Sequence, residues 1–314
     1  MTGRAMKYLF GPVNSRRLGV SLGVDLVPYK TCSLNCVYCE CGDTTDLTSA
    51  VAEYVPTDEV IAELDGYCAA SPRLDVITFS GSGEPTLHSG IGRIIDHIKD
   101  RYPRYRVAVL TNGTMLRDPA VRRSIARADI VVPSLDAASR QAFARICRPG
   151  AGITPEDVIR GLVEFRKEFT GKLYLEIFVV PGVNDTPEEL ALLREACVVI
   201  APDMVQINSL DRPGAAGWVS PLGHAELDAI AEFFRPLPVE VIGKPASRGP
   251  AEGKTGNLVK EIVSILRRRP STIEDLMTAL GATGEELRAA LASMTEAGMV
   301  TVERLERGEF YRMV

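Results

Sequence analysis

The chain has 314 residues, enough for one large domain and a small one, and its formal net charge of −5 argues against a surface that binds polyanions in general. Its seven cysteines lack the regular, even spacing of a secreted disulfide scaffold. The first residues lack the long apolar region of a signal peptide, and no apolar run approaches membrane-spanning length. We therefore expect a cytoplasmic protein with no membrane partner.

Strand-like apolar runs alternate with amphipathic helical runs from Gly19 to about Leu210. The alternation predicts a parallel sheet with a ligand site at the carboxyl ends of its strands. Six such units are too few to close an eightfold barrel, so we predict an α/β fold, a partial (β/α)6 barrel over residues 1–242. Expected strands cover residues 19–27, 75–79, 106–110, 130–133, 172–180 and 204–210, and expected helices cover 57–70, 91–101, 118–128, 155–169, 187–200 and 225–234.

After a predicted linker, residues 243–256, the alternation of strands and helices gives way to a different pattern. Within it, residues 249–255 resemble a phosphate-binding loop, but the spacing is one residue short and no buried strand leads into it. Residues 257–314 predict a small winged helix-turn-helix domain, with Ser271 as an N-cap and Glu274 completing its capping box. Expected helices cover 258–268, 273–280 and 285–297, and expected strands cover 300–305 and 309–313.

Three cysteines, Cys32, Cys36 and Cys39, have the spacing C-x3-C-x2-C in a short loop after the first predicted strand. A four-iron cluster normally takes four cysteine ligands, so three ligands would leave one iron open for chemistry. The triplet alone leaves two other interpretations: a zinc site that adds Cys41, and a disulfide pair. Two scattered cysteines, Cys68 and Cys197, fall on apolar helix faces and are expected in the core.

The triplet, with Tyr38 before its last cysteine and Gly81-Ser82-Gly83-Glu84 one unit later, resembles the radical S-adenosylmethionine (SAM) superfamily. The similarity spans roughly residues 11–213. Residues 11–19 and 79–86 are similar to the wyosine-type branch, whose members resemble tRNA imidazoguanosine synthetase. The resemblance implies a [4Fe–4S] cluster on the triplet, SAM on its open iron, and a radical enzyme that cleaves SAM reductively. It also implies flavodoxin or ferredoxin as an electron donor.

The same resemblance implies SAM contacts at the strand ends. Gly81 and Gly83 would let the backbone approach the methionine end of SAM, whereas Ser134 and Asp136 would bind the ribose hydroxyls. The alternatives are an ordinary strand-end turn for the glycines, an Asx turn for Asn112 and a helix cap for Asp136. The candidate SAM-binding residues are Tyr38, Gly81, Ser82, Gly83, Glu84, Asn112, Ser134, Asp136, Glu176 and Asn208.

The candidate substrate contacts are Arg16, Arg17, Cys41 and Arg148. The first two belong to a basic amino-terminal patch that would meet a phosphate backbone or a carboxylate, with a solvated face as the alternative. For Cys41 the alternatives are a substrate-side thiol, a fourth ligand and a bystander.

An RNA base or nucleotide is the preferred substrate. A peptide or protein docked by the tail is the second hypothesis, and a zinc-bearing winged-helix regulator is the third. Residues 255–314 hold eight Lys or Arg against nine Asp or Glu, so we do not expect the tail to bind duplex DNA tightly. We expect the tail to bind protein or peptide, or to pack on the barrel.

Overall fold

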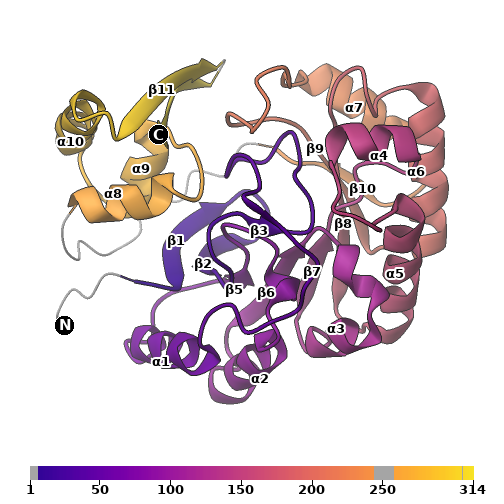
Figure 1. The fold of residues 1–314 in the computed structure, drawn as a ribbon, viewed down its shortest axis with the longest axis horizontal. Coiled ribbons are helices and arrows are strands. Elements are labelled where there is room, and N and C mark those ends of the chain that lie inside the picture. The colour runs from indigo at the N-terminus through magenta and orange to yellow at the C-terminus, as the bar shows by residue number, and fades with distance from the viewer. Residues whose placement is uncertain (1–5, 244–257, 306) are drawn as a thin grey trace.

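The structure is a computed structural model that describes residues 6–243, 258–305 and 307–314. The predicted linker lies outside the described residues except for Gly243, and the phosphate-loop-like segment 249–255 lies outside them entirely. The described part of the chain holds an eight-stranded mixed sheet in the order β1-β2-β5-β6-β7-β8-β9-β10 (Figure 1).

All six predicted strands of the sheet are present and parallel, and β10 extends them at one edge. The other edge is β1, which pairs with β2 in the antiparallel sense. Neither edge strand had been predicted, since β10 has only three residues and β1 contains Gly11 and Pro12, which usually interrupt strands. The strands are β1 (Leu9–Ser15), β2 (Gly19–Val24), β5 (Val76–Phe79), β6 (Arg106–Thr111), β7 (Ile130–Pro133), β8 (Lys172–Phe178), β9 (Met204–Asn208) and β10 (Val239–Val241).

Helices follow most of the parallel strands and lie around the outside of the sheet (Figure 1). Thr57, where the predicted helix 57–70 begins, is the first residue of α1, and Pro56 occupies the N-cap. The helices are α1 (Thr57–Cys68), α2 (Ile91–Arg101), α3 (Pro119–Ser124), α4 (Arg140–Ile146), α5 (Pro155–Glu168), α6 (Pro187–Ile200) and α7 (His224–Phe233), with short 3-10 turns at η1 (Pro85–Leu87) and η2 (Thr114–Arg117) and a two-residue strand pair, β3 (Thr31–Cys32) and β4 (Asp46–Leu47). No helix in the described ranges is long and apolar enough to cross a membrane.

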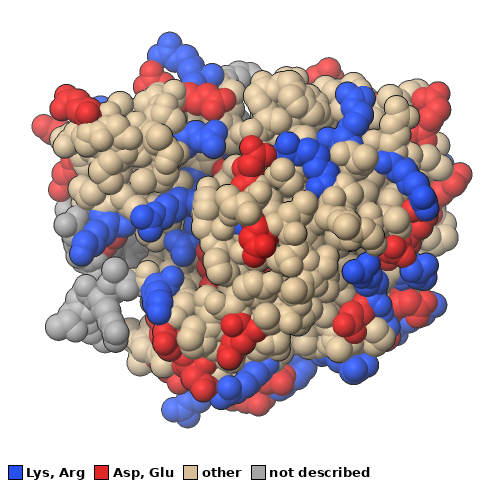
Figure 2. All heavy atoms as spheres, viewed as in Figure 1, with Lys and Arg blue, Asp and Glu red and all other residues tan. Residues whose placement is uncertain are grey.

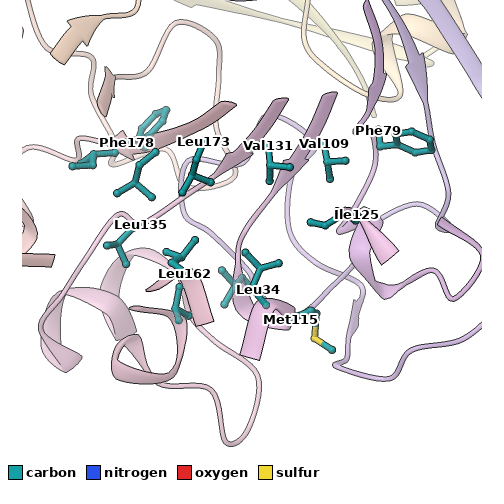
Figure 3. Close-up of a cluster of buried hydrophobic side chains, with 14 of the residues drawn as sticks. Leu34, Phe79, Val109, Met115, Ile125, Val131, Leu135, Leu162, Leu173 and Phe178 are labelled. Atoms are coloured by element: carbon teal, nitrogen blue, oxygen red, sulfur yellow. The ribbon is translucent and has the colours of Figure 1, made fainter. Parts of the chain in front are cut away.

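The main core lies between the sheet and these helices. Figure 3 shows Val109, Val131 and Leu173 pointing from their strands towards the helix layer, where Ile125 and Leu162 meet them. Cys68 and Cys197 are buried in this core, as predicted.

The opposite face of the sheet carries a smaller apolar cluster that includes Val76, Ala108 and Ile130. Side chains alternate between faces along a strand, so Thr78 lies on the same face as Val76, nearer the carboxyl end. The same face carries Glu176 and Gln206, which pair in register between β8 and β9. Polar side chains therefore gather towards the carboxyl ends of the strands on this face.

The carboxyl-terminal segment, residues 258–314, has an apolar core of its own around Ile262, Leu276 and Leu291. Thr272 and Asp275 form the capping box of its second helix; the predicted cap at Ser271 is wrong, because Ser271 pairs with Tyr311 through the backbone. Its elements are α8 (Leu258–Leu266), α9 (Ile273–Leu280), α10 (Gly284–Glu296), β11 (Val300–Leu305) and β12 (Gly308–Met313). The segment lies beside β1 (Figure 1), which α8 and α9 contact.

Candidate active site

The cysteine loop, residues 30–41, is bonded to the loop that follows β5. Lys30 N donates to Ser82 O at 2.9 Å, and Glu84 N donates to Thr31 O at 3.1 Å. A Cβ on Gly83 would lie 2.0 Å from Thr31 O, so only glycine permits this close approach. The predicted SAM-binding motif and the predicted cluster loop are thus a single hydrogen-bonded unit.

Glu84 joins the ends of β5 and β6 beneath that unit. Its Oε1 accepts from Thr86 N, Thr86 Oγ1 and Thr111 Oγ1, and its Oε2 accepts from Asn112 N at 2.7 Å. Burial raises the pKa of this carboxyl, although the hydrogen bonds oppose the shift. Glu84 therefore holds two strand ends in register.

Asn112 makes the predicted Asx turn and also reaches the cysteine loop. Its Oδ1 accepts from Thr114 N at 3.0 Å, whereas its Nδ2 donates to Ser33 Oγ at 2.9 Å and lies 3.4 Å from Cys32 Sγ. The Asx-turn interpretation is confirmed, and the turn aims the amide at the first cysteine of the triplet. Contact of Asn112 with SAM stays a prediction.

Residues 146–150, after α4, form another contact with the cysteine loop. Val37 N donates to Ile146 O at 2.9 Å, and Asn35 N donates to Cys147 O at 3.0 Å. The guanidinium of Arg148 donates to Asn35 O and pairs with Asp43 at 2.8 Å. Arg148, predicted as a substrate contact, is therefore engaged by the cysteine loop itself.

The segment that follows β9 packs on the last part of the loop. Ala216 N donates to Val37 O at 2.8 Å, and a Cβ on Gly214 would lie 3.0 Å from the Cα of Tyr38. Arg212 lies 3.6 Å from Glu40, the residue between Cys39 and Cys41 in the loop. The loop is thus held by the ends of β5, β6 and β9 and by the residues after α4.

The cysteines occupy different electrostatic environments. A hydrogen bond from Cys41 and the charge of Lys30, acting against burial, lower the pKa of Cys39 to about 5. Lys30 is buried and its Nζ lies 2.9 Å from Cys39 Sγ. Burial, with Glu84 nearby, raises the pKa of Cys32 to about 12. Since a ligating thiol must lose its proton, the buried ammonium of Lys30 supplies a counter-charge for bound thiolates.

The thiol set is suited to a cluster better than to one metal ion. Across the described ranges, no three His, Cys, Asp or Glu side chains converge closely enough to hold a single ion. A four-iron cube spreads its cysteine ligands over a wider space. The Cys41 thiol lies next to Cys39 and also 2.7 Å from Arg268 O, so it contacts the carboxyl-terminal segment. The four-cysteine zinc site therefore has no support in this geometry, whereas the residues present fit a cluster on three cysteines.

Tyr38 and Asp136 position each other. The Tyr38 ring stacks on Phe178 with centroids 3.9 Å apart, and its hydroxyl donates to Asp136 Oδ2 at 2.5 Å. Asp136 Oδ1 accepts from Phe178 N at 2.9 Å, and burial raises the pKa of Asp136 to about 7. The helix-cap interpretation of Asp136 is wrong, because Ser139 caps α4.

Glu176 finds partners within the protein. Its two oxygens accept from Arg17 at 2.6 Å and from Asn208 Nδ2 at 2.7 Å, and the Arg17 charge lowers its pKa although burial alone would raise it. Arg16 lies 3.4 Å from Asn208 Oδ1. The two arginine side chains are only 16% and 14% exposed, so the solvated-face interpretation is wrong for them. Ser134 forms an isolated bridge with Glu176.

Two residues that sequence reasoning missed tie the carboxyl-terminal segment to this site. Asp25 accepts from Ser82 N at 3.2 Å, from Ser82 Oγ at 2.6 Å and from Arg268 Nε at 3.0 Å. An acid at the end of the apolar run of β2 was an available signal for Asp25, because a buried carboxylate needs partners. Arg268 carried no such signal, because its partner Asp25 lies 243 residues away in the sequence. The expectation that the tail packs on the rest of the chain is confirmed.

Comparison with known proteins shows the family. Residues 26–193 match the Radical SAM superfamily. A UPF0026 protein of Synechocystis is 40% identical over 206 residues, which cover 65% of this chain and 76% of that protein. A Brachyspira hyodysenteriae protein named GTPase Obg is 34% identical over 298 residues, covering 95% of this chain. The chain spans only 44% of that relative's length.

More distant similarities agree in fold. A Streptomyces coelicolor protein named GTP 3',8-cyclase is 29% identical over 177 residues, covering 56% of this chain and 50% of that protein. A radical SAM methyltransferase from Sphaerobacter thermophilus superposes with a TM-score of 0.56 at 17% identity, covering 70% of this chain and 65% of that one. The chain belongs to the radical SAM superfamily and has the α/β fold of that family with a mixed sheet. It is an enzyme of the family whose cofactors are a [4Fe–4S] cluster and SAM.

Proposed function

We propose that Cys32, Cys36 and Cys39 hold the cluster and that SAM binds beside them on the loop after β5. When bound, the reduced cluster and SAM supply a 5′-deoxyadenosyl radical that abstracts hydrogen from the substrate. The observation that carries this proposal is the direct bonding of residues 81–84 to Lys30 and Thr31. It gives the cluster loop and the methionine-binding loop one fixed geometry.

The remaining side chains have positioning roles in this proposal. Lys30 balances the charge of the thiolates, and Asn112 orients the first cysteine. Tyr38 and Asp136 hold each other close to Cys36 and Cys147, and Ser134, Glu176 and Asn208 form the side on which the adenosine would lie. Satisfied buried groups such as these are rigid, and rigidity keeps the reacting atoms in place.

We also propose a domain arrangement. The curled mixed sheet of residues 1–242 is interpreted as a partial (β/α)6 barrel, and residues 257–314 as a winged-helix domain, with residues 243–256 as the linker. The separate apolar core of the carboxyl-terminal segment and its order of three helices followed by a hairpin support this division.

A nucleotide, free or as an RNA base, is the substrate class that we propose. The similarity of residues 11–19 and 79–86 to the wyosine-type branch supports it, as does the relative named for a reaction of GTP. A flavodoxin or ferredoxin is the proposed electron donor, and the cytoplasm is the proposed location. A peptide substrate remains the competing outcome, whereas a zinc-bearing regulator is no longer proposed for a member of this enzyme family.

The substrate class is tested by hydrogen transfer. Reconstituted protein, SAM and dithionite are incubated under anaerobic conditions with fractionated tRNA, with mononucleotides or with cell peptide extract. We expect SAM cleavage to accelerate only with tRNA or nucleotides, and a mass change to appear in that fraction. Acceleration by the peptide fraction alone would overturn the nucleotide assignment while leaving the radical chemistry intact.

A further inference from the structure

A cavity of about 240 Å³ lies where the carboxyl-terminal hairpin meets the ends of β9 and β10. Arg16, Asp211 and Arg307 supply its charged wall, and Leu227 and Leu305 are among its apolar lining. Its volume is below the roughly 300–1,000 Å³ of pockets for drug-sized ligands, so it suits one small group of a larger molecule.

Arg16 brings an incompletely paired guanidinium to this cavity. Its side chain is 16% exposed, its hydrogen bond to Asn208 Oδ1 is long at 3.4 Å, and Asp211 is 4.0 Å away. Asp211 is itself bound by Arg307 at 2.5 Å and lies 3.7 Å from Arg212. Because a guanidinium offers five N–H donors in a planar fork, Arg16 retains donors for a ligand.

A buried network of arginines and carboxylates adjoins the cavity. Arg212 lies 3.6 Å from Glu40 and 3.2 Å from Asp275, which also pairs with Arg307. Arg212 is 6% exposed, and its Nε is buried without a hydrogen-bond partner in the described part of the chain. Burial and the neighbouring Arg212 lower the pKa of Arg269 to about 10. Arg212 thus adds a second incompletely paired guanidinium next to the cavity.

A helix terminus adds to the preference for an anion. The cavity wall includes Gly223, the N-cap of α7, and His224, its first residue. The amino-terminal end of a helix carries a partial positive charge and favours anions. One of its groups is already used, because Gly223 N donates to Glu226 at 2.8 Å.

We propose that this cavity binds a phosphate group of the substrate, with Arg16 as its ligand, because Arg307 is already paired with Asp211 and Asp275. A planar guanidinium fork matches phosphate oxygens in a bidentate manner. Arg16 touches Asn208, and Glu40, which pairs with Arg212, lies between Cys39 and Cys41. A phosphate held here therefore places its sugar and base towards the cluster loop. The inference rests on the proposed nucleotide substrate and adds the site that recognises it.

The surface agrees with a local anion site. Figure 2 shows charged side chains mainly around the rim of the visible face, while its centre, in front of β3, β6 and β7, is mostly uncharged. No broad basic area crosses that face. Phosphate recognition thus depends on a few arginines at the junction.

The test is calorimetric titration of the full chain, prepared without cluster or SAM, with inorganic pyrophosphate at about 0.15 M ionic strength. We expect saturable binding that Arg16→Gln weakens about tenfold, which corresponds to about 1.4 kcal/mol. Arg304→Gln, on the same hairpin as Arg307 but 79% exposed, should leave binding within about twofold of the wild type. Arg16→Lys keeps the charge and the fold, and should weaken binding by a smaller factor because it loses the fork.

Parallel titrations with total tRNA and with hexaglutamate identify the source of the anion. Arg16-dependent binding of tRNA supports an RNA phosphate, and Arg16-dependent binding of pyrophosphate alone supports a free nucleotide. Equal binding by wild type and Arg16→Gln, no saturation by any phosphate probe, or equal competition by hexaglutamate would overturn the proposal. Because no cluster is needed, such a failure leaves the SAM-cleavage test of the proposed function untouched.

Discussion

Buried polar side chains around the cysteine loop satisfy one another, and two of them carry unusual charge states. Lys30 keeps its ammonium in a buried position beside Cys39, and Asp136 keeps a carboxyl against the Tyr38 hydroxyl. Neither arrangement is stable without its partner, because an unpaired buried charge is costly. Both therefore report on the integrity of the site.

Asp136 predicts a dependence of stability on pH. Burial raises its pKa to about 7, above the unfolded value of about 3.9, so the folded protein takes up a proton between these values. Its contribution is fully favourable below about pH 4 and is lost as the pH rises through 7. As the pH rises from 5 to 8, the free energy of unfolding of Asp136→Asn should increase relative to that of the wild type by on the order of 2 kcal/mol. Guanidinium unfolding at each pH measures this difference.

Asp58→Asn provides the control for this measurement. Asp58 is 79% exposed, so the same substitution there controls for the removal of a carboxyl charge that is not buried. A difference for Asp136→Asn that is equal at both pH values would show that the buried carboxyl does not titrate in this range.

Gly83 predicts a steric test of the loop unit. In Gly83→Ala the new Cβ meets Thr31 O, which forces the loop after β5 away from the cysteine loop. We expect a loss of about 1–3 kcal/mol in the free energy of unfolding, the usual cost of overpacking a buried site, and poor iron incorporation. Gly66→Ala, in α1 with nothing within 4 Å of the new Cβ, should be neutral or slightly stabilising. Normal iron incorporation in Gly83→Ala would contradict the conclusion that the cysteine loop and the loop after β5 form one structural unit.

At the level of elements, the site is made where strands end. Helices with long amphipathic periodicity, such as α2 and α6, were predicted with their observed bounds. The edge strands β1 and β10 escaped prediction because Pro12 and a length of three residues remove the pattern. The sequence also placed the polar strand ends together correctly, because parallel strands share a carboxyl edge.

The pairings within that edge were not predictable from the sequence. Glu176 was expected to need SAM as its partner, but Arg17, 159 residues away, supplies the charge. Gly83 was expected to make room for SAM, and the structure shows it making room for Thr31. Such contacts join residues that are far apart in the sequence, so a single sequence contains no local signal for them. The SAM and substrate roles of the individual residues stay predictions.

Docking of α8 predicts a coupling between the carboxyl-terminal segment and the loop after β5. Arg268 bonds Asp25, which also holds Ser82 through two hydrogen bonds. Arg268→Gln leaves a carboxylate that is 7% exposed without its charge partner, a loss that costs about 3–5 kcal/mol in buried pairs. We expect lower stability and weaker SAM binding to reconstituted protein, measured by equilibrium dialysis.

The neighbouring Arg267→Gln is the matched control, because Arg267 is exposed on the same turn. It should change neither property by more than a few tenths of a kcal/mol. Weakened SAM binding in both variants, or in neither, would contradict the predicted coupling between the carboxyl-terminal segment and the loop after β5.

For the whole molecule, the carboxyl-terminal segment completes the active-site side of the sheet. It contacts β1 and meets the residues after β9 through Arg212, Asp275 and Arg307. Its acidic balance argued against duplex DNA binding, and the structure pairs Arg268 and Arg307 with carboxylates outside the segment. The segment thus contributes to the architecture of the candidate site.

The formation of 5′-deoxyadenosine from SAM tests the central claim most directly. Anaerobically reconstituted wild type and Cys41→Ala should each hold about four irons and produce 5′-deoxyadenosine and methionine with dithionite. Alanine at Cys32, Cys36 or Cys39 should abolish both the cluster and the product. An intact cluster that yields no 5′-deoxyadenosine, or a cluster that survives loss of any of these three cysteines but not of Cys41, would contradict the account.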